Sequence, residues 1–68
     1  MKITLNGEKY TLETGSNLVD LIEKLGLNMD KLAIERNLEI VPKSKFAMTI
    51  IEEGDKLELV HFIGGGKE

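Results

Sequence analysis

The spacing of apolar residues changes near the start of the chain, and this change limits the possible folds more than any other feature of the sequence. Residues 2 to 6 and 8 to 12 each alternate apolar and polar side chains, as strands with one buried face do. The Asn6-Gly7 step between them tolerates the positive φ values of a type I′ turn. The sequence therefore predicts a β-hairpin over residues 2 to 12.

A helix is predicted shortly after this hairpin. Apolar residues now recur at i, i+3, i+4 and i+7, namely at Leu18, Leu21, Ile22 and Leu25. Ser16 or Asn17 can cap the first turn, and Gly26 can adopt the left-handed conformation that ends a helix. We expect a helix of about two turns.

Short strands follow the helix. The sequence predicts strands at residues 32 to 36, 39 to 41 and 56 to 63. Leu38 fits a two-residue turn poorly, because a bulky side chain disfavours positive φ, so we expect a wider connection between the first two of these strands. Residues 43 to 48 fit one helical turn in which Phe46 points inward.

The element order ββαβββ predicts an α+β fold in which a mixed sheet of four to five strands curls over one main helix. This is the β-grasp, or ubiquitin-like, architecture, with the last strand paired centrally with the first. We expect residues 1 to 63 to form this domain and residues 64 to 68 to form a flexible glycine-rich C-terminal tail. The expected core consists of Ile3, Leu5, Tyr10, Leu12, Leu18, Leu21, Ile22, Leu25, Ile34, Ile40, Phe46, Leu57 and Leu59.

The length and composition of the chain exclude several classes of protein. Sixty-eight residues give room for one small domain. The absence of cysteine excludes disulfides, thiolate zinc sites and a thiol nucleophile, and the net charge of -3 argues against nucleic acid as a partner. No apolar run approaches the roughly 20 residues of a membrane span, and the first residues do not resemble a signal peptide. We therefore expect a cytoplasmic protein that binds no membrane.

Residues that could support catalysis or bind a metal are scarce. His61 is the only histidine, so neither a Ser-His-acid triad nor a two-histidine metal site can be assembled, and we give His61 no role. The acidic residues Glu52, Glu53, Asp55 and Glu58 match no calcium-loop spacing. They form either a solvated acidic face or an electrostatic surface for a basic partner. We expect a protein that is not an enzyme and that binds neither metal nor cofactor.

The last strand and the residues after it carry the strongest indication of function. Strict alternation along this strand places Val60 and Phe62 on the open face of the sheet, beside Glu58. Apolar side chains on an open face are typical of a contact surface. Gly64-Gly65-Gly66 follows, and a run without side chains can enter a narrow channel and deliver a carboxyl group to another protein's active site. Such a carboxylate needs activation, for example adenylation, before sulfur or an amine can attack it.

Several segments of the chain together carry a family resemblance. They are Met1-Lys2-Ile3-Thr4-Leu5-Asn6-Gly7, Leu18-Val19-Asp20-Leu21-Ile22, Ile40-Val41-Pro42-Lys43-Ser44, Gly54-Asp55 and Val60-His61-Phe62-Ile63-Gly64-Gly65-Gly66. Over residues 1 to 66 the chain resembles the ThiS family, the sulfur carriers of thiamine biosynthesis. The resemblance implies that an E1-like enzyme of the ThiF type uses ATP to adenylate the C-terminal glycine, which then becomes a thiocarboxylate. A thiazole synthase of the ThiG type would receive the sulfur.

The resemblance also assigns roles to individual residues. Gly65 and Gly66 match the terminal diglycine of the family, preceded here by Gly64, and the carbonyl carbon of Gly66 would hold the sulfur. The strand and tail that are expected to contact both enzymes comprise Val60, Phe62 and Ile63, with Glu58 beside them.

Two residues follow the diglycine in this sequence. Because Lys67 and Glu68 come after it, Gly66 is an internal amide and has no free carboxylate. Three explanations remain open: the two residues are removed before activation, they are additions to the native chain, or this copy carries no sulfur. We expect removal.

Related families with the same predicted fold offer other functions. A sulfur carrier of the molybdopterin synthase type is similar in plan, although it is usually longer. A stand-alone binding or regulatory module like the TGS domain also resembles the hairpin, the Val41-Pro42 step and Gly54-Asp55, and such a module would bind RNA. Attachment to other proteins in the manner of ubiquitin would use the same activated glycine with an amine acceptor.

Overall fold

Asn6 and Gly7 turn the chain between β1 (Lys2–Leu5) and β2 (Glu8–Thr11). In the computed structural model, which describes residues 1 to 62, both turn residues have positive φ, 50° and 83°. The two strands pair antiparallel, and Leu5 lies opposite Glu8 across the turn. The predicted N-terminal hairpin is confirmed.

The helix α1 spans Leu18–Leu25, and side-chain caps fix where it begins. The Asn17 Oδ1 atom accepts a hydrogen bond from the Asp20 N–H at 2.7 Å, and the Asp20 carboxylate accepts one from the Asn17 N–H at 3.0 Å. This capping box satisfies two N–H groups that have no partner within the helix. Gly26, with a φ of 71°, ends the helix as predicted.

The sheet is mixed, with its last strand in the middle. The strand order is β2-β1-β5-β3-β4, where β3 is Leu32–Arg36, β4 is Glu39–Val41 and β5 is Lys56–His61. β5 runs parallel to β1 and antiparallel to β3. The short 3₁₀ helices η1 (Met29–Lys31) and η2 (Lys43–Met48) occupy two of the connections. The predicted α+β fold and the order ββαβββ are confirmed.

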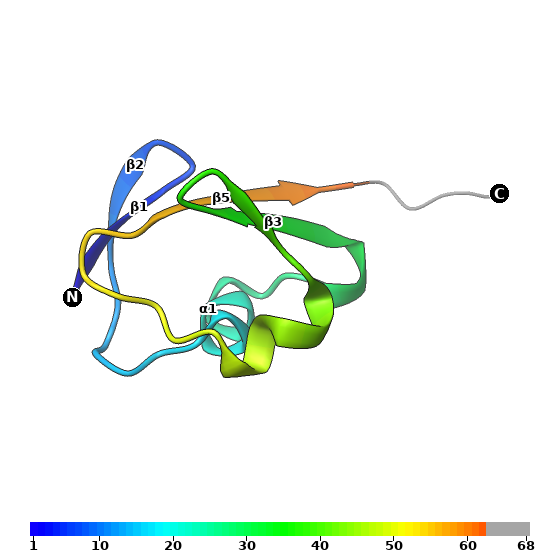
Figure 1. The fold of residues 1–68 in the computed structure, drawn as a ribbon, viewed down its shortest axis with the longest axis horizontal. Coiled ribbons are helices and arrows are strands. Elements are labelled where there is room, and N and C mark those ends of the chain that lie inside the picture. The colour runs from blue at the N-terminus through cyan, green and yellow to red at the C-terminus, as the bar shows by residue number, and fades with distance from the viewer. Residues whose placement is uncertain (63–68) are drawn as a thin grey trace, which may run out of the picture.

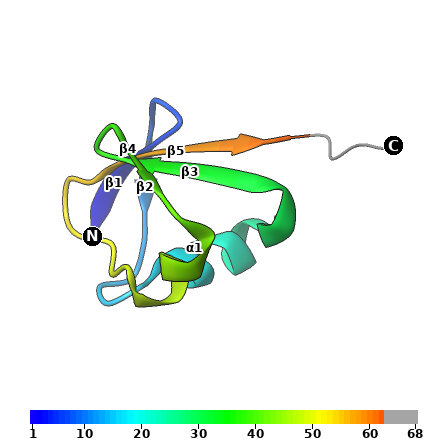
Figure 2. The ribbon, with the colours of Figure 1, turned by 45° about the vertical axis from the view of Figure 1, so that its right-hand side comes forward.

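Among the described residues, the helices lie on one side of this sheet, and no element covers its other face. Figure 1 shows α1 beneath the strands, and the turned view in Figure 2 shows α1 and η2 together on the same side. Within residues 1 to 62, no helix is long and apolar enough to cross a membrane.

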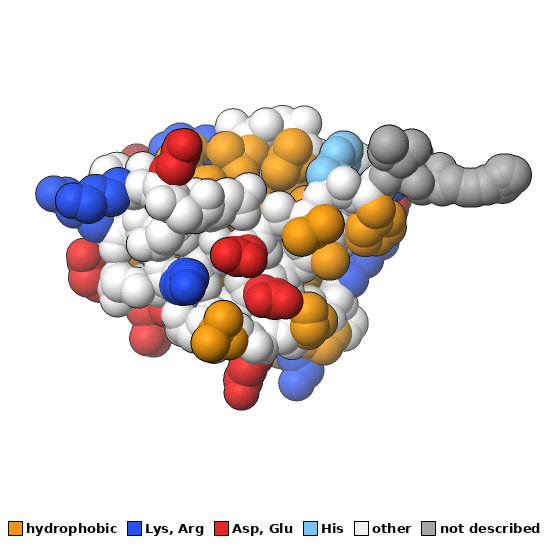
Figure 3. Space-filling view, turned by 90° about the horizontal axis from the view of Figure 1, so that it is seen from above, with side chains coloured by type: hydrophobic (Ala, Val, Ile, Leu, Met, Phe, Trp, Pro, Cys, Tyr) orange, Lys and Arg blue, Asp and Glu red, His pale blue; other side chains and the backbone are white. Residues whose placement is uncertain are grey.

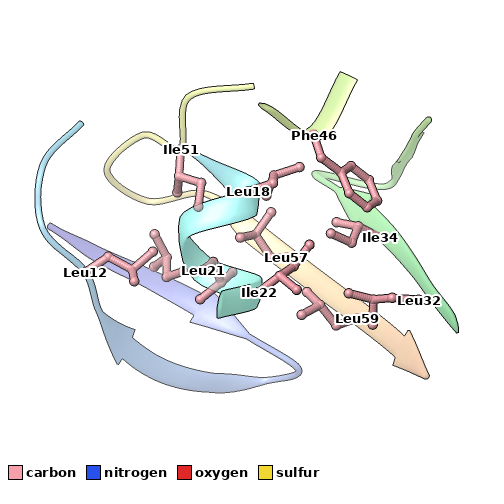
Figure 4. Close-up of a cluster of buried hydrophobic side chains, with 11 residues drawn as sticks. Leu12, Leu18, Leu21, Ile22, Leu32, Ile34, Phe46, Ile51, Leu57 and Leu59 are labelled. Atoms are coloured by element: carbon pink, nitrogen blue, oxygen red, sulfur yellow. The ribbon is translucent and has the colours of Figure 1, made fainter. Parts of the chain in front are cut away.

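The hydrophobic core lies between the sheet and α1 (Figure 4). The buried residues are Ile3, Leu12, Leu18, Leu21, Ile22, Leu32, Ile34, Phe46, Ile51, Leu57 and Leu59. Phe46 points inward from η2, as expected. The predicted members Leu5, Tyr10 and Leu25 are only partly buried, whereas Leu32 and Ile51 belong to the core without having been predicted.

The turn between β3 and β4 is tighter than expected. Asn37 and Leu38 alone connect the strands, with φ values of 52° and 75°, so the prediction of a wider connection is wrong. Contacts from outside the turn explain this. The Asn37 N–H donates to the Lys56 carbonyl at 2.8 Å, and the Asn37 Oδ1 atom accepts from the Lys56 N–H at 2.9 Å. Surrounding structure thus holds Leu38 in a conformation that it disfavours alone.

This tight turn also moves Ile40 out of the core, where the sequence pattern placed it. With two residues in the turn, Ile40 pairs with Glu35, so its side chain lies on the outward face of the sheet. Val41, its neighbour, pairs with the buried Ile34 and packs partly against the core instead. The prediction that Ile40 is a core residue is wrong because side chains alternate between the two faces of a strand.

Candidate functional site

The outer face of the sheet, opposite α1, carries those predicted partner contacts that lie within residues 1 to 62. Along β5, Leu57 and Leu59 are buried, whereas Glu58 is exposed. Val60 is 58% exposed and Phe62 is 47% exposed. Figure 3 looks onto this face and shows hydrophobic and acidic side chains side by side on it. The expected exposure of these residues is confirmed, while their role as contacts stays a prediction.

The chain remains attached to the sheet up to the last described residue. His61 pairs with Leu32, and the Phe62 N–H donates to the Lys31 carbonyl at 3.0 Å. Phe62, from which the chain continues toward the predicted tail, is therefore held in place relative to the outer face. Ile63 and residues 64 to 68, which include the predicted sulfur-carrying Gly64, Gly65 and Gly66, lie outside the described residues.

The strand register brings further residues next to the predicted contacts. Val60 pairs with Ala33, and Glu58 pairs directly with Glu35. On the other side of β3, Glu35 pairs with Ile40, which is 65% exposed. The sequence analysis did not single out Glu35 and Ile40 as site residues. A two-residue turn at Asn37-Leu38 would have revealed them, because it fixes which residues of the two strands are opposite each other.

His61 lies on the helix side of β5. It borders a shallow, mainly apolar hollow of about 310 Å³, whose lining also includes Leu5, Leu25 and Leu59. His61 therefore shares a face with Leu59. Within residues 1 to 62, no group of three or more His, Asp or Glu side chains could hold a metal ion.

Comparison with known families and proteins gives a consistent match. The family model described as the ThiS family matches residues 3 to 66. A thiazole synthase of Paramagnetospirillum magneticum is 47% identical over 68 residues, which cover 100% of this chain and 21% of that protein. The sulfur carrier protein ThiS of Bacillus subtilis is 35% identical over 66 residues, which cover 94% of this chain and 98% of that protein. The chain thus spans about a fifth of the length of the thiazole synthase that it matches.

A solved structure shows the same fold. The crystal structure of the thiamine biosynthesis protein ThiS from Geobacter metallireducens superposes with a TM-score of 0.84 and 29% sequence identity. The superposition covers 97% of this chain and all of that one. The predicted β-grasp architecture is confirmed, as is the predicted family resemblance.

Proposed function

We propose, because this chain belongs to the ThiS family of sulfur carriers for thiamine biosynthesis, that it carries sulfur as a thiocarboxylate on Gly66. The observation that supports this most strongly is the end of β5. There two exposed apolar residues, Val60 and Phe62, lie shortly before the glycines Gly64-Gly65-Gly66 in the sequence. A partner that binds the outer face would therefore contact the residues that precede the glycines in the sequence.

The proposed chemistry has two steps, both catalysed by partner enzymes. First, a carboxylate oxygen of Gly66 attacks the α-phosphorus of ATP, pyrophosphate leaves, and an acyl adenylate forms on the chain. A hydrosulfide equivalent from a sulfur donor then attacks the carbonyl carbon, and AMP leaves as a good leaving group. The product is a thiocarboxylate. The chain supplies the carbonyl carbon and the docking surface, and it binds no cofactor itself.

The proposed partners are an adenylating enzyme of the ThiF type and a thiazole synthase of the ThiG type. Both must reach the same glycines, so we assign Val60, Phe62, Ile63 and Glu58 to contacts with them. Phe62 and Val60 supply exposed apolar area, and its burial in a complex favours binding. Glu58 supplies a charge that orients the complex. Because activation consumes ATP, we place the reaction in the cytoplasm. Activation also requires that Lys67 and Glu68 be removed from Gly66.

Reconstitution of thiazole formation tests this function. The assay combines a chain that ends at Gly66 with purified adenylating enzyme, thiazole synthase, ATP, a sulfur donor and the substrates that supply the carbon and nitrogen atoms of the ring. Thiazole product is then quantified. We expect product only when this chain is present. A matched chain that ends at Ile63 retains the described domain but lacks the glycines, and it should support none. Product formation that is independent of the chain, or equal with the shorter one, would contradict the proposal.

A further inference from the structure

We propose that the β3–β4 hairpin is a second docking element, used by thiazole synthase and remote from Phe62, the last described residue before the glycines. Leu38 and Ile40 would enter an apolar hollow of that enzyme, and Glu35 and Glu58 would receive a Lys or Arg side chain beside it. This inference rests on the proposed function. It adds Glu35, Leu38 and Ile40 to the residues that bind a partner.

Leu38 strains the backbone of the turn, and its side chain buries little apolar surface within the described domain. Its φ of 75° lies in the left-handed region, which a leucine adopts only with strain and which Gly or Asn tolerates. Its side chain is 78% exposed, so it buries little apolar surface in return. A residue that both strains the backbone and leaves its side chain in water is explained by a contact that forms outside this domain.

Ile40 extends this apolar surface along the edge strand. It is exposed on the outer face, where Glu35 is its partner on β3, and among the described residues β4 is an edge strand of the sheet. Leu38 and Ile40 thus place two exposed aliphatic side chains close together in the edge hairpin, and water solvates such a surface poorly. Burial in a complementary hollow would remove both from water at once.

The carboxylates of Glu35 and Glu58 give this surface its electrical character. They are direct partners across β3 and β5, and like charges in this position destabilise a sheet. Within residues 1 to 62, neither carboxylate forms an ion pair. A cationic side chain from a partner would relieve the repulsion, and neutral or acidic surfaces would not. Charge complementarity therefore selects a partner with Lys or Arg beside its apolar hollow.

The β3–β4 hairpin and Phe62, the last described residue, lie at opposite ends of the sheet. Leu32, at one end of β3, pairs with His61, whereas Arg36, at the other end, pairs with Leu57. Figure 1 accordingly shows the β3–β4 turn away from the C-terminal end of β5. The five residues of β3 span four rises of about 3.3 Å, so its two ends are roughly 13 Å apart. An enzyme that contacts both ends of the sheet would fix the orientation of this domain, and with it the direction from which the tail enters the active site. Of the two proposed partners we choose thiazole synthase, because domains similar to this one occur within thiazole synthase chains.

Binding measurements test the inference, with the substituted and the unsubstituted chains all ending at Gly66. The double variant Leu38→Asn with Ile40→Thr removes the apolar surface, while Asn suits the left-handed turn and Thr suits a strand. We expect its Kd for purified thiazole synthase to rise about tenfold or more, with no fall in thermal stability. Glu35→Gln should also raise this Kd, weaken its dependence on salt and increase thermal stability. AMP acceptance from the adenylating enzyme should not change in either variant.

Met48→Gln is the matched control, because Met48 is 71% exposed but lies on η2, on the helix side of the sheet. It should bind thiazole synthase as the unsubstituted chain does. Three results would each overturn the inference. They are an unchanged Kd for the hairpin variants, an equal loss of affinity in Met48→Gln, and a loss that affects only AMP acceptance from the adenylating enzyme. If the unsubstituted chain binds thiazole synthase and accepts AMP, such results leave the proposed function intact. If the unsubstituted chain does neither, both proposals fail.

Discussion

A chain that ends at Gly66 is expected to accept AMP from the adenylating enzyme, whereas the chain that retains Lys67 and Glu68 is not. An amide carbonyl cannot displace pyrophosphate from ATP as a carboxylate does, so the internal Gly66 is inert. The carboxylate of the longer chain lies two residues further on, or about 7 Å in an extended segment. A displacement of even about 1 Å from the reactive position can reduce a rate by about a hundredfold.

ATP–pyrophosphate exchange measures this difference directly. We expect exchange to be at least about a hundredfold faster with the chain that ends at Gly66 than with the 68-residue chain. The two chains share every described residue, so a difference between them reports the terminus and not the fold. Equal exchange with both chains, or no exchange with the shorter one, would rule out Gly66 as the site of activation.

Replacement of Asp55 by Asn is expected to lower the free energy of unfolding at pH 7 by about 2 kcal/mol. Asp55 is buried where β5 begins. Its Oδ2 atom accepts hydrogen bonds from the Arg36 Nε and the Glu52 N–H, both at 2.9 Å, and its Oδ1 atom accepts one from the Asn37 side chain at 3.1 Å. An asparagine side chain at position 55 would place an NH₂ donor among groups that also donate. Arg36 would then lose its buried carboxylate partner.

This contribution of Asp55 depends on pH in a definite direction. Burial alone would raise the pKa of the Asp55 carboxyl, but the hydrogen bonds from Glu52, Asn37 and Arg36, with the charge of Arg36, outweigh it and hold that pKa below its usual 3.8. A carboxyl with a lowered pKa in the folded state stabilises the fold above the pKa of the unfolded chain. The stabilisation is lost as the pH falls through the lower folded pKa. The difference between the two proteins should therefore shrink below about pH 4.

Urea unfolding at pH 7 and at pH 3 measures both effects, and Asp30→Asn is the matched control. A hydrogen bond and the charge of Lys43 also lower the pKa of Asp30, but this pair lies on the surface, where such pairs contribute little to stability. Asp30→Asn should thus unfold at the same urea concentration as the unsubstituted chain. A loss of stability for Asp55→Asn that is the same at both pH values would contradict the assigned role of the ionised carboxylate.

The sequence predicts most of this fold because its local signals agree with one another. The Asn6-Gly7 turn, the capping residue Asn17 and the terminating Gly26 each determine their own conformation within a few residues. The alternation along β5 is equally local, so the exposure of Val60 and Phe62 follows from it.

The features that the sequence did not predict depend on contacts between distant segments. Asn37 adopts its tight turn because it forms two hydrogen bonds with Lys56, 19 residues further along the chain. The Asn37 N–H donates to the Lys56 carbonyl, and the Asn37 side-chain oxygen accepts from the Lys56 N–H. The register of β4, and with it the outward position of Ile40, follows from that turn. For the same reason Glu35 could not be recognised as the neighbour of Glu58 before the pairing of β3 with β5 was known. The prediction failed where a leucine occupies a position that favours glycine.

The intact mass of the protein, purified without tags from its own host, tests the central claim most directly. The claim is that sulfur is held on the carbonyl carbon of Gly66. We predict a species whose mass corresponds to a chain ending at Gly66 plus about 16 Da, because a thiocarboxylate differs from a carboxylate by one sulfur in place of one oxygen. A mass that retains Lys67 and Glu68 in every species, with no sulfur-bearing form, would contradict the claim.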